Sequence, residues 1–418
     1  MLDNHRQSLL IAGLIIVVLI FLIGATLINY RYVSTDKGDN AFLARWLGSR
    51  LFLLQGQSPY DEQTSREAQL LAYGRTAQPE EDPLYYLYPF YSFYLFAPFT
   101  FISEFNVARA LWMTVLEAAA LFIVIFGISV SDWKVPRIYL IIVILFSLLW
   151  FYAVYPILDG NVAVLCVLMV VGAMLAIKSE QDVLAGLLLA FSTIKPQIVI
   201  LVILFILIWA VSKRRWMIVW SFLLSAVLLI ASTVFLLPDW LMQNVRQIIR
   251  YVEQTLLITP GFVLYDWLPG IGKQLGWLLT GVSVIILLLE WRAALGKGYR
   301  WFIWTVNLTL VCTIIVGIPS SPVNFIMLLP SLILIFLTII HWCGTIGRVL
   351  VISSILSILA LFWGIYLRRG IDGFEIEISP IYYLVLPVIS LLGLYWVRWW
   401  AVHKQRILLE ETSDKYIE

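Results

Sequence analysis

Apolar runs of roughly 20 residues recur along almost the whole chain, and they limit what it can fold into. A helix of about that length crosses the roughly 30 Å of hydrocarbon in a bilayer, where only helices or closed barrels satisfy their backbone. Barrel strands would be shorter and would alternate polar with apolar residues, so these runs predict helices. Since 61% of the residues are hydrophobic and 13% are charged, a soluble domain would expose too much apolar surface. The sequence therefore predicts an all-α polytopic membrane protein.

The net charge, the cysteines and the histidines give no sign of a cofactor or of a nucleic-acid partner. The formal net charge is only +2. Cys166, Cys312 and Cys343 lie in or beside apolar runs without ligand spacing, so we interpret them as small core residues. The 3 histidines also lack metal-ligand spacing, and the chain has no phosphate-binding glycine loop or nucleophile motif. We expect neither a cofactor nor a resident metal.

Basic clusters predict how the helices are oriented. They lie at residues 213–215, 292–300 and 398–406 and at Arg348, and the positive-inside rule assigns them to the cytoplasm. We therefore expect a multi-pass protein of the plasma membrane with both termini in the cytoplasm.

Two topologies are open for the part of the chain before these clusters. Either residues 91–102 cross the membrane and residues 183–211 form one long helix, or residues 91–102 only dip into the outer leaflet. In the second topology, which we favour, residues 183–211 form two short spans that meet at Lys195-Pro196, because proline disfavours helix at the preceding residue. This topology predicts about twelve spans.

The predicted organisation is a single membrane domain over residues 1–418. Residues 9–28 are expected to be a retained transmembrane helix. After it we expect a first outer loop with interfacial helices (29–88), a re-entrant segment or second span (89–103), a transmembrane core (104–237), an outer loop with an amphipathic helix (238–270), C-terminal transmembrane helices (271–402) and a cytoplasmic tail (403–418). Extramembrane helices are predicted at residues 39–54, 62–73 and 240–256, and the first and third have the apolar face of helices that lie in the membrane interface.

Asp39, at the start of the long polar loop, is the strongest catalytic candidate. A carboxylate at the boundary of water and lipid can accept the proton of a hydroxyl group as that oxygen attacks. The alternative is that Asp39 only caps the helix that follows it. Asp36 is the second candidate for the base.

The favoured topology brings Asp39, the turn Asp159-Gly160-Asn161 and Lys195 to the outer face. Lys195 is an ionisable residue within an apolar segment, which by default suggests a function. It could contact the phosphate of a lipid carrier, or it could reach up to the lipid headgroups. In the favoured topology residues 106–128 form the second span, and Arg109, near its outer end, is a further candidate for a phosphate contact.

The loop also carries an acidic run, Glu80-Glu81-Asp82, followed by several tyrosines. The run could orient an acceptor through Asp82 or hold a divalent cation, although adjacent acids in a loop are most often solvated surface. Tyr88 and the earlier Tyr60 are candidates for substrate binding, with membrane-interface anchoring as the alternative role for such aromatics.

The order of these motifs resembles glycosyltransferase family 87, of the GT-C class. The resemblance covers residues 39 to 215 and rests on Asp39, Arg45-Trp46-Leu47-Gly48-Ser49-Arg50, Gly56-Gln57-Ser58-Pro59-Tyr60, Tyr73-Gly74-Arg75, Tyr88-Pro89, Pro98, Trp112, Gly160-Asn161, Ala185-Gly186 and Lys195-Pro196. The sequence departs from the family pattern at Asn40 and in Gly160-Asn161, which lacks the usual glutamine.

The resemblance implies a GT-C fold and an inverting transfer of a hexose, typically mannose, from a polyprenyl-phosphate donor outside the plasma membrane. Asp39 would be the general base and Lys195 a phosphate contact. The implied partners are the polyprenyl-phosphate sugar, a glycolipid, glycan or protein acceptor, and membrane lipids.

Two other classes compete with this prediction. A transporter or flippase of lipid-linked sugars would use Glu117 and Lys195 in its pathway, but the chain lacks the repeat symmetry that such proteins often carry. An oligosaccharide polymerase or ligase would be expected to have its dominant outer loop late in the chain.

Overall fold

The computed structural model describes residues 2–35, 41–78, 81–131, 133, 136–255, 257–372 and 379–402. Every regular element in these ranges is helical, which confirms the all-α prediction. The elements in the first half are α1 (Leu2–Thr35), α2 (Ala41–Gln55), α3 (Glu62–Tyr73), η1 (Phe90–Ser92), α4 (Phe93–Thr100), α5 (Phe105–Ser131), α6 (Arg137–Leu149), α7 (Phe151–Asp159), α8 (Ala163–Lys178), α9 (Asp182–Ser192) and α10 (Pro196–Ser212). Those in the second half are α11 (Trp216–Leu236), α12 (Trp240–Gln254), α13 (Pro260–Trp267), α14 (Gly272–Ala294), α15 (Tyr299–Ile315), η2 (Pro322–Leu328), α16 (Leu329–Trp342), α17 (Gly344–Asp372), η3 (Ile381–Val385), α18 (Leu386–Trp396) and α19 (Arg398–Val402).

Six helices in the described ranges are long and apolar enough to cross a membrane, and the number is seven if α6 and α7, bent by 46°, form one span. Shorter apolar helices, which include α8, α9 and α10, stand where the sequence predicts further spans. At about 1.5 Å per residue these are too short to cross the hydrocarbon unaided. The chain is thus a polytopic helical membrane protein, with six or seven candidate spans in the described ranges.

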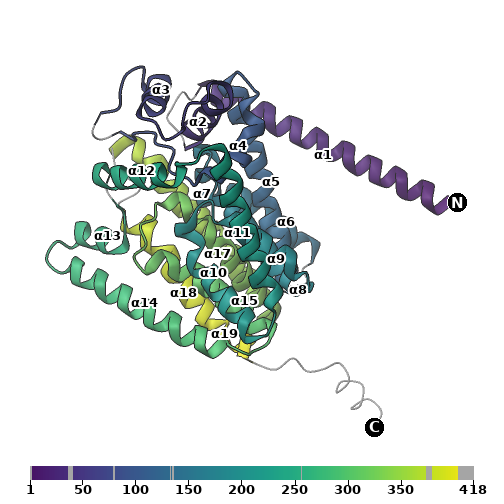
Figure 1. Cartoon of the computed structure of the whole chain (residues 1–418). Helices are drawn as coiled ribbons and strands as arrows, with labels where there is room; N and C mark the ends of the chain where they lie inside the picture. Colours follow the sequence, from purple (N-terminus) through teal and green to yellow (C-terminus); the bar gives the residue numbers. More distant parts are fainter. Residues whose placement is uncertain are drawn as a thin grey trace, which may run out of the picture.

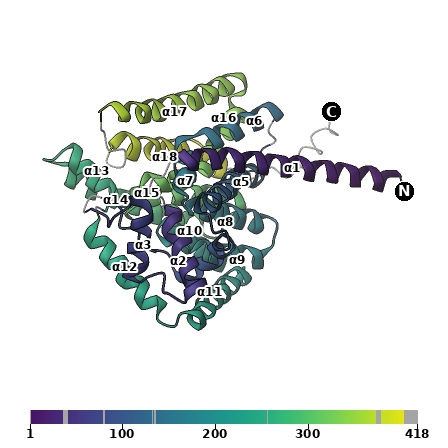
Figure 2. The ribbon, with the colours of Figure 1, turned by 90° about the horizontal axis from the view of Figure 1, so that it is seen from above.

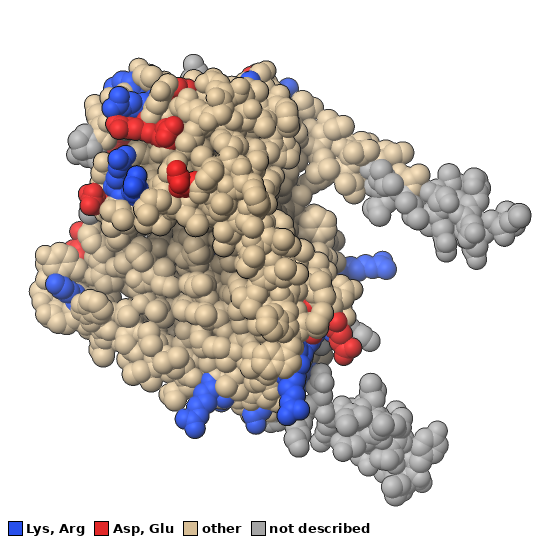
Figure 3. Space-filling view, viewed as in Figure 1, with Lys and Arg blue, Asp and Glu red and all other residues tan. Residues whose placement is uncertain are grey.

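Charge is distributed as expected for a protein embedded in a bilayer. On the face shown in Figure 3, charged side chains gather at the top and basic ones at the bottom, with a broad, almost uncharged zone between them. The helices α2, α3 and α12 occupy the top of the molecule and α19 the bottom (Figure 1). We call these the upper and lower ends of the molecule.

The helices α8 to α11 run alternately between these two ends. At one end Arg215, after α10, donates from Nε to Oδ1 of Asp182 at 3.0 Å, which joins the start of α9 to the start of α11. At the other end Lys195, between α9 and α10, bonds Asn161 before α8. The helix break at Lys195-Pro196 is therefore real, since α9 ends at Ser192 and α10 begins at Pro196.

The first helix is longer than predicted. α1 continues past residue 28 to Thr35 because its polar residues find partners on neighbouring elements. Asn29 donates to the Thr114 hydroxyl of α5 at 3.1 Å, and the Tyr30 hydroxyl donates to Glu104 at 3.1 Å. The N-terminal part of α1 projects away from the other helices (Figures 1 and 2).

α2 packs inside the protein, although the sequence predicts that it lies in the membrane interface. Phe42 is fully buried, and its ring stacks on Trp112 of α5 with the ring centroids 5.3 Å apart. The indole of Trp46 donates to the carbonyl of Phe99, at the end of α4, at 3.0 Å. α4 itself has eight residues, about 12 Å at 1.5 Å per residue, which is too short for a span.

α12 has the opposite arrangement, with its polar face turned inward. Asn244 and Gln247 are buried, whereas Val245, Ile249 and other apolar residues of the helix are exposed. Asn244 donates to the backbone carbonyl of Tyr88 at 3.3 Å. α12 therefore fastens the loop before α4 and leaves an apolar surface on its other side.

Candidate functional site

The turn after α7 provides the frame of the site. Gly160 has the left-handed backbone that ends the helix (φ 70°), and the N–H groups of Gly160 and Asn161 donate to the carbonyls of Ile157 and Pro156 at 3.1 and 2.8 Å. This is the Schellman pattern, which glycine adopts without steric cost. The carbonyl of Gly160 accepts from the indole of Trp112 at 2.8 Å, which fixes the turn against α5.

Replacement of Gly160 by alanine is expected to destabilise the protein strongly. A Cβ atom at Gly160 would lie 2.6 Å from Cβ of Phe42, in addition to the strained left-handed backbone. Gly56 is the matched control, because its φ is +69° and a Cβ there would meet nothing within 4 Å. We expect Gly56→Ala to cost about 1–2 kcal/mol and Gly160→Ala to cost about 1–3 kcal/mol more. Thermal unfolding in detergent measures both, and equal shifts for the two variants would contradict this packing.

Three of the predicted residues meet beside this turn, and we call Asp159, Asn161 and Lys195 the Lys195 cluster. Nζ of Lys195 donates to Oδ1 of Asn161 at 2.6 Å. The amide of Asn161 donates in turn to Oδ2 of Asp159 at 3.0 Å. Lys195 is only 4% exposed, so it does not reach out to lipid headgroups.

The start of α2 completes the cluster. The backbone N–H of Ala41 donates to Oδ1 of Asp159 at 3.1 Å, so the positive end of a helix faces this carboxylate. Asp36 and Asp39 lie outside the described residues. The structure describes the chain again at Ala41, two residues after Asp39, in contact with the cluster.

Arg45, one turn into α2, extends the site above the cluster. It is 8% exposed, and its guanidinium lies over the ring of Tyr88, 4.4 Å from the centroid. Its Nη1 donates to the carbonyl of Ala41 at 2.8 Å. Arg45 and Asp159 are both close enough to Lys195 to act on its charge.

Tyr60 and Tyr88 form a buried pair rather than an open platform for a sugar ring. The hydroxyl of Tyr60 donates to the carbonyl of Tyr88 at 2.7 Å, and Tyr60 lies edge-on to Tyr86. Burial raises the pKa of Tyr88 well above its ordinary range, against the opposing effect of Arg45, so its phenol stays neutral. Both tyrosines are thus placed to support Arg45.

Arg109 also lies against the frame of the site. It is buried on α5, and its Nη2 donates to the carbonyl of Leu158, next to Asp159, at 3.1 Å. Its guanidinium also lies 6.0 Å from the centroid of the Tyr32 ring. Arg109 therefore holds the end of α7 to α5 beside the cluster.

Asp82 forms a hydrogen bond within its own loop and takes no part in the Lys195 cluster. Its side chain is exposed, and Oδ1 accepts from the N–H of Leu84 at 2.7 Å. Glu81 pairs with Arg75 at 2.6 Å, and Glu80 lies outside the described residues. Among the described residues no group of three or more potential metal ligands occurs.

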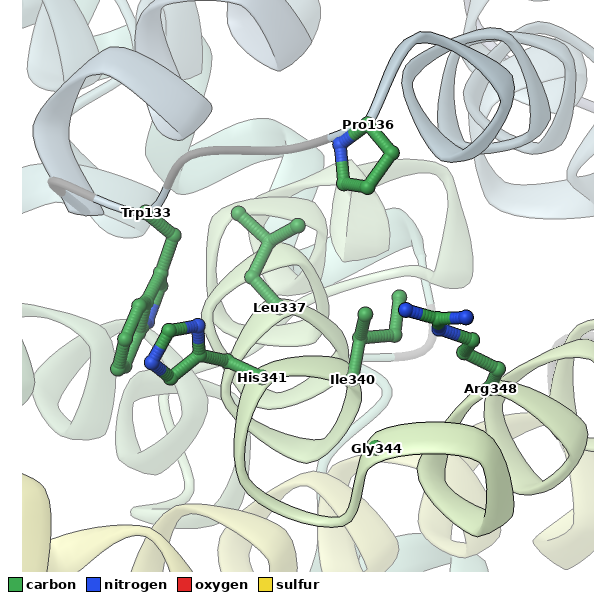
Figure 4. A pocket seen from close by; sticks show the side chains of 7 residues that line it. All are labelled: Trp133, Pro136, Leu337, Ile340, His341, Gly344 and Arg348. Carbon is green, nitrogen blue, oxygen red and sulfur yellow. The ribbon is translucent and has the colours of Figure 1, made fainter.

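Two hollows lie away from the Lys195 cluster. One, of about 160 Å³, is lined by Trp133, His341 and Arg348 at the end of α16 (Figure 4). The other, of about 600 Å³, is an open groove along Asp182, Leu184 and Met217. The ion pair of Asp182 with Arg215 places this groove at the end of α8 to α11 opposite Lys195.

Comparison of the chain with models of known protein families gives its family. A family model described as glycosyltransferase family 87 matches residues 86–319, which is more than half of the 418-residue chain. The chain belongs to glycosyltransferase family 87. No curated protein and no solved structure matches it. As a member of family 87 the protein is a glycosyltransferase, which uses a sugar donor and an acceptor in a membrane setting.

The family 87 match differs in extent from the sequence resemblance. It continues to residue 319, well beyond residue 215, and it includes Tyr88, Arg109 and the Lys195 cluster. Asp39, Arg45 and Tyr60 precede it. The described part of the first loop contacts the matched part of the chain through Ala41, Arg45 and Tyr60.

Arg45 was not among the residues predicted from the sequence to form the site. Arg45 occurs in one of the motifs that carry the resemblance, on a helix expected at the membrane surface. Its charge next to Ala44 and Trp46, on a helix with so many apolar residues, was a signal that part of α2 faces a polar site.

Proposed function

We propose that this glycosyltransferase transfers a hexose, with mannose as the expected sugar, from a polyprenyl-phosphate donor to a hydroxyl of a glycolipid, glycan or protein acceptor. The observation that carries the proposal is the meeting of Lys195, Asn161 and Asp159 with the start of α2, two residues after Asp39. Such a transfer uses a cation that neutralises the phosphate, proposed to be Lys195, and a carboxylate that acts as general base, proposed to be Asp39.

On the donor side, Lys195 is the group proposed to contact the phosphate. It is buried and held by Asn161, so its charge has a fixed position. Arg109 contributes positive charge behind the turn that carries Asp159. Neither contact needs a metal ion, because the phosphate already leaves readily once its developing charge is neutralised.

On the acceptor side, Asp39 is the proposed general base. The acceptor oxygen attacks the anomeric carbon from the face opposite the phosphate, and its proton passes to the Asp39 carboxylate. The bond from the anomeric carbon to the phosphate oxygen breaks with its electron pair, which leaves polyprenyl phosphate. Attack in line with the leaving group inverts the anomeric centre, and fixing both reactants supplies much of the rate.

The proposed topology has about twelve spans of bilayer length or shorter, with both termini in the cytoplasm and the site at the outer face. Its support is the charge pattern: the lower end carries Lys213, Arg214 and Lys297, which the positive-inside rule assigns to the cytoplasm. The upper end, with α2, α3 and α12, then lies outside the plasma membrane (Figure 1). Interfacial packing of α12 through its apolar face is consistent with this orientation.

Purified protein in detergent tests the donor class. We expect transfer of labelled mannose from synthetic polyprenyl-phosphate mannose to a mixture of candidate glycolipid and glycan acceptors, and none from a nucleotide-linked mannose. Other polyprenyl-phosphate hexoses should be used less well. Efficient transfer from the nucleotide sugar in place of the lipid donor would contradict the proposal, and block transfer of a preassembled oligosaccharide would favour a polymerase or ligase.

A further inference from the structure

Arg45 is a buried cation whose hydrogen-bonding capacity is only partly used. It is 8% exposed, with Nη1 bonded to the carbonyl of Ala41 at 2.8 Å. Its Nε is buried and has no hydrogen-bond partner in the described part of the chain. Within the same part, no carboxylate forms an ion pair with it.

Burying a charged group in this way is costly unless something compensates it. An isolated cation in a low-dielectric environment loses several kcal/mol of hydration. The centroid of the Tyr88 ring lies 4.4 Å from the guanidinium carbon, and the negative face of the ring offsets part of the lost hydration free energy. The Nε–H group, which has no partner among the described residues, is a donor that an anionic ligand could use.

A chain of hydrogen bonds connects Arg45 with Lys195. Arg45 bonds the carbonyl of Ala41, and the N–H of Ala41 bonds Asp159. Asp159 in turn is joined through Asn161 to Lys195. Arg45 lies close enough to Lys195 for the two like charges to act on each other, although Asp159 acts on Lys195 more strongly and with the opposite sign. An anion bound beside both cations would be attracted by both.

We propose that Arg45 and Lys195 together hold the phosphate of the lipid donor, and that Arg45 is the second half of this phosphate site. The proposal rests on the proposed function. Arginine offers a planar fork of donors that matches phosphate oxygens, whereas lysine offers a point charge. The pair would therefore fix both the position and the orientation of the phosphate.

Two cations also suit the change in charge during the reaction. The phosphate in the donor is a diester with one negative charge. When the bond to the anomeric carbon breaks, the electron pair stays on the phosphate oxygen and the product becomes a monoester with a second negative charge. Arg45 and Lys195 would therefore interact more strongly with the transition state than with the donor, which raises the rate.

Tyr88 positions Arg45 in this account. Its backbone carbonyl accepts from the Tyr60 hydroxyl at 2.7 Å and from Asn244 of α12 at 3.3 Å. These bonds fix the ring that lies under the guanidinium. α12 thereby connects the lipid-facing surface of the protein with the phosphate site.

Product inhibition by a short-chain polyprenyl phosphate tests the proposal directly. We expect Arg45→Gln to raise the inhibition constant of this product by about 10- to 100-fold and to lower kcat, because charge-assisted hydrogen bonds to phosphate are lost. Arg45→Lys should recover part of both. Arg50→Gln is the matched control, since Arg50 lies on the same helix and bonds the carbonyl of Ile102 at 3.5 Å instead.

Inorganic phosphate serves as the second probe. It shows whether the site binds the phosphate of a lipid carrier or free phosphate. If the site holds the phosphate of a lipid carrier, free phosphate should inhibit far more weakly than polyprenyl phosphate, and Arg45→Gln should weaken both. Equal inhibition by the two would assign the site to free phosphate and overturn a lipid-carrier site.

The outcomes distinguish this proposal from the proposed function. An unchanged inhibition constant and full transfer in Arg45→Gln would overturn the role of Arg45 and leave the transferase intact, whereas a lack of transfer by the natural protein would remove the basis of both. If Arg45→Gln fails to fold, Tyr88→Leu and Tyr88→Phe carry the test. The first removes the ring under Arg45 and should weaken product inhibition, and the second keeps the ring and should not.

Discussion

Replacing Asp39 by asparagine is expected to reduce sugar transfer by at least about 100-fold while the protein still folds. Asparagine caps a helix about as well as aspartate does, so the start of α2 should keep its structure. It cannot accept the proton of the acceptor hydroxyl. Initial rates of transfer with purified variants in detergent, beside thermal unfolding curves, measure the two effects separately.

Asp36→Asn is the control for this substitution. Asp36 lies three residues earlier in the sequence, and its replacement should leave transfer largely intact if Asp39 is the base. Full activity of Asp39→Asn would reduce Asp39 to a helix cap. Loss of activity only in Asp36→Asn would move the base to Asp36.

Replacing Lys195 by methionine should have the second largest effect. The side chains are similar in length, but methionine leaves the Oδ1 atom of Asn161 without the 2.6 Å bond from Nζ and Asp159 without the neighbouring cation. We expect kcat/KM for the lipid donor to fall by about 10- to 100-fold, as lost charge-assisted bonds to phosphate require. We also expect a lower thermal midpoint, since the half-buried Asp159 carboxylate loses its neighbouring cation.

Lys213→Met is the matched control for charge removal. Lys213 bonds the carbonyl of Gly296 at 2.8 Å in the loop that follows α10, at the opposite end of that helix from Lys195. Its removal should leave the donor KM unchanged. If Lys195→Met lowers the thermal midpoint but leaves the KM and kcat for the donor at their natural values, Lys195 is a structural residue and not a phosphate contact.

Local signals in the sequence predicted much of the fold. The polar segment at Glu62–Tyr73 is a helix with the expected bounds, and proline after Lys195 marks the break between α9 and α10. Apolar runs of roughly the right length to cross a bilayer give the membrane class directly. These features depend on neighbouring residues in the chain, so the sequence alone carries them.

What the sequence did not predict depends on contacts between distant segments. The apolar face of α2 fits a membrane surface as well as a protein interior, and only the positions of Trp112 and Phe99 decide in favour of the interior. Arg45 was missed for the same reason, since its partner Tyr88 lies far along the chain in an irregular loop. α1 extends beyond its apolar run because Asn29 finds Thr114 on α5.

The candidate site was predicted in part. Topology alone led us to expect Asp159, Asn161 and Lys195 at the same end of the molecule, and they are joined by hydrogen bonds there. Asp82 was also a candidate because of its charge and its place in the loop, and it instead bonds the backbone of Leu84. Charge in a loop is a weak signal, whereas a lysine inside an apolar segment is a strong one.

The proposed activity moves a sugar between molecules and does not carry a lipid-linked sugar across the membrane. Proteoliposomes that contain the purified protein, with labelled polyprenyl-phosphate mannose and an acceptor added on the outside, test it in one measurement. We predict a new covalent product that carries the label, with the opposite anomeric configuration to the donor, and its loss in Asp39→Asn. Counterflow of the labelled donor across the bilayer without any covalent product would contradict the account.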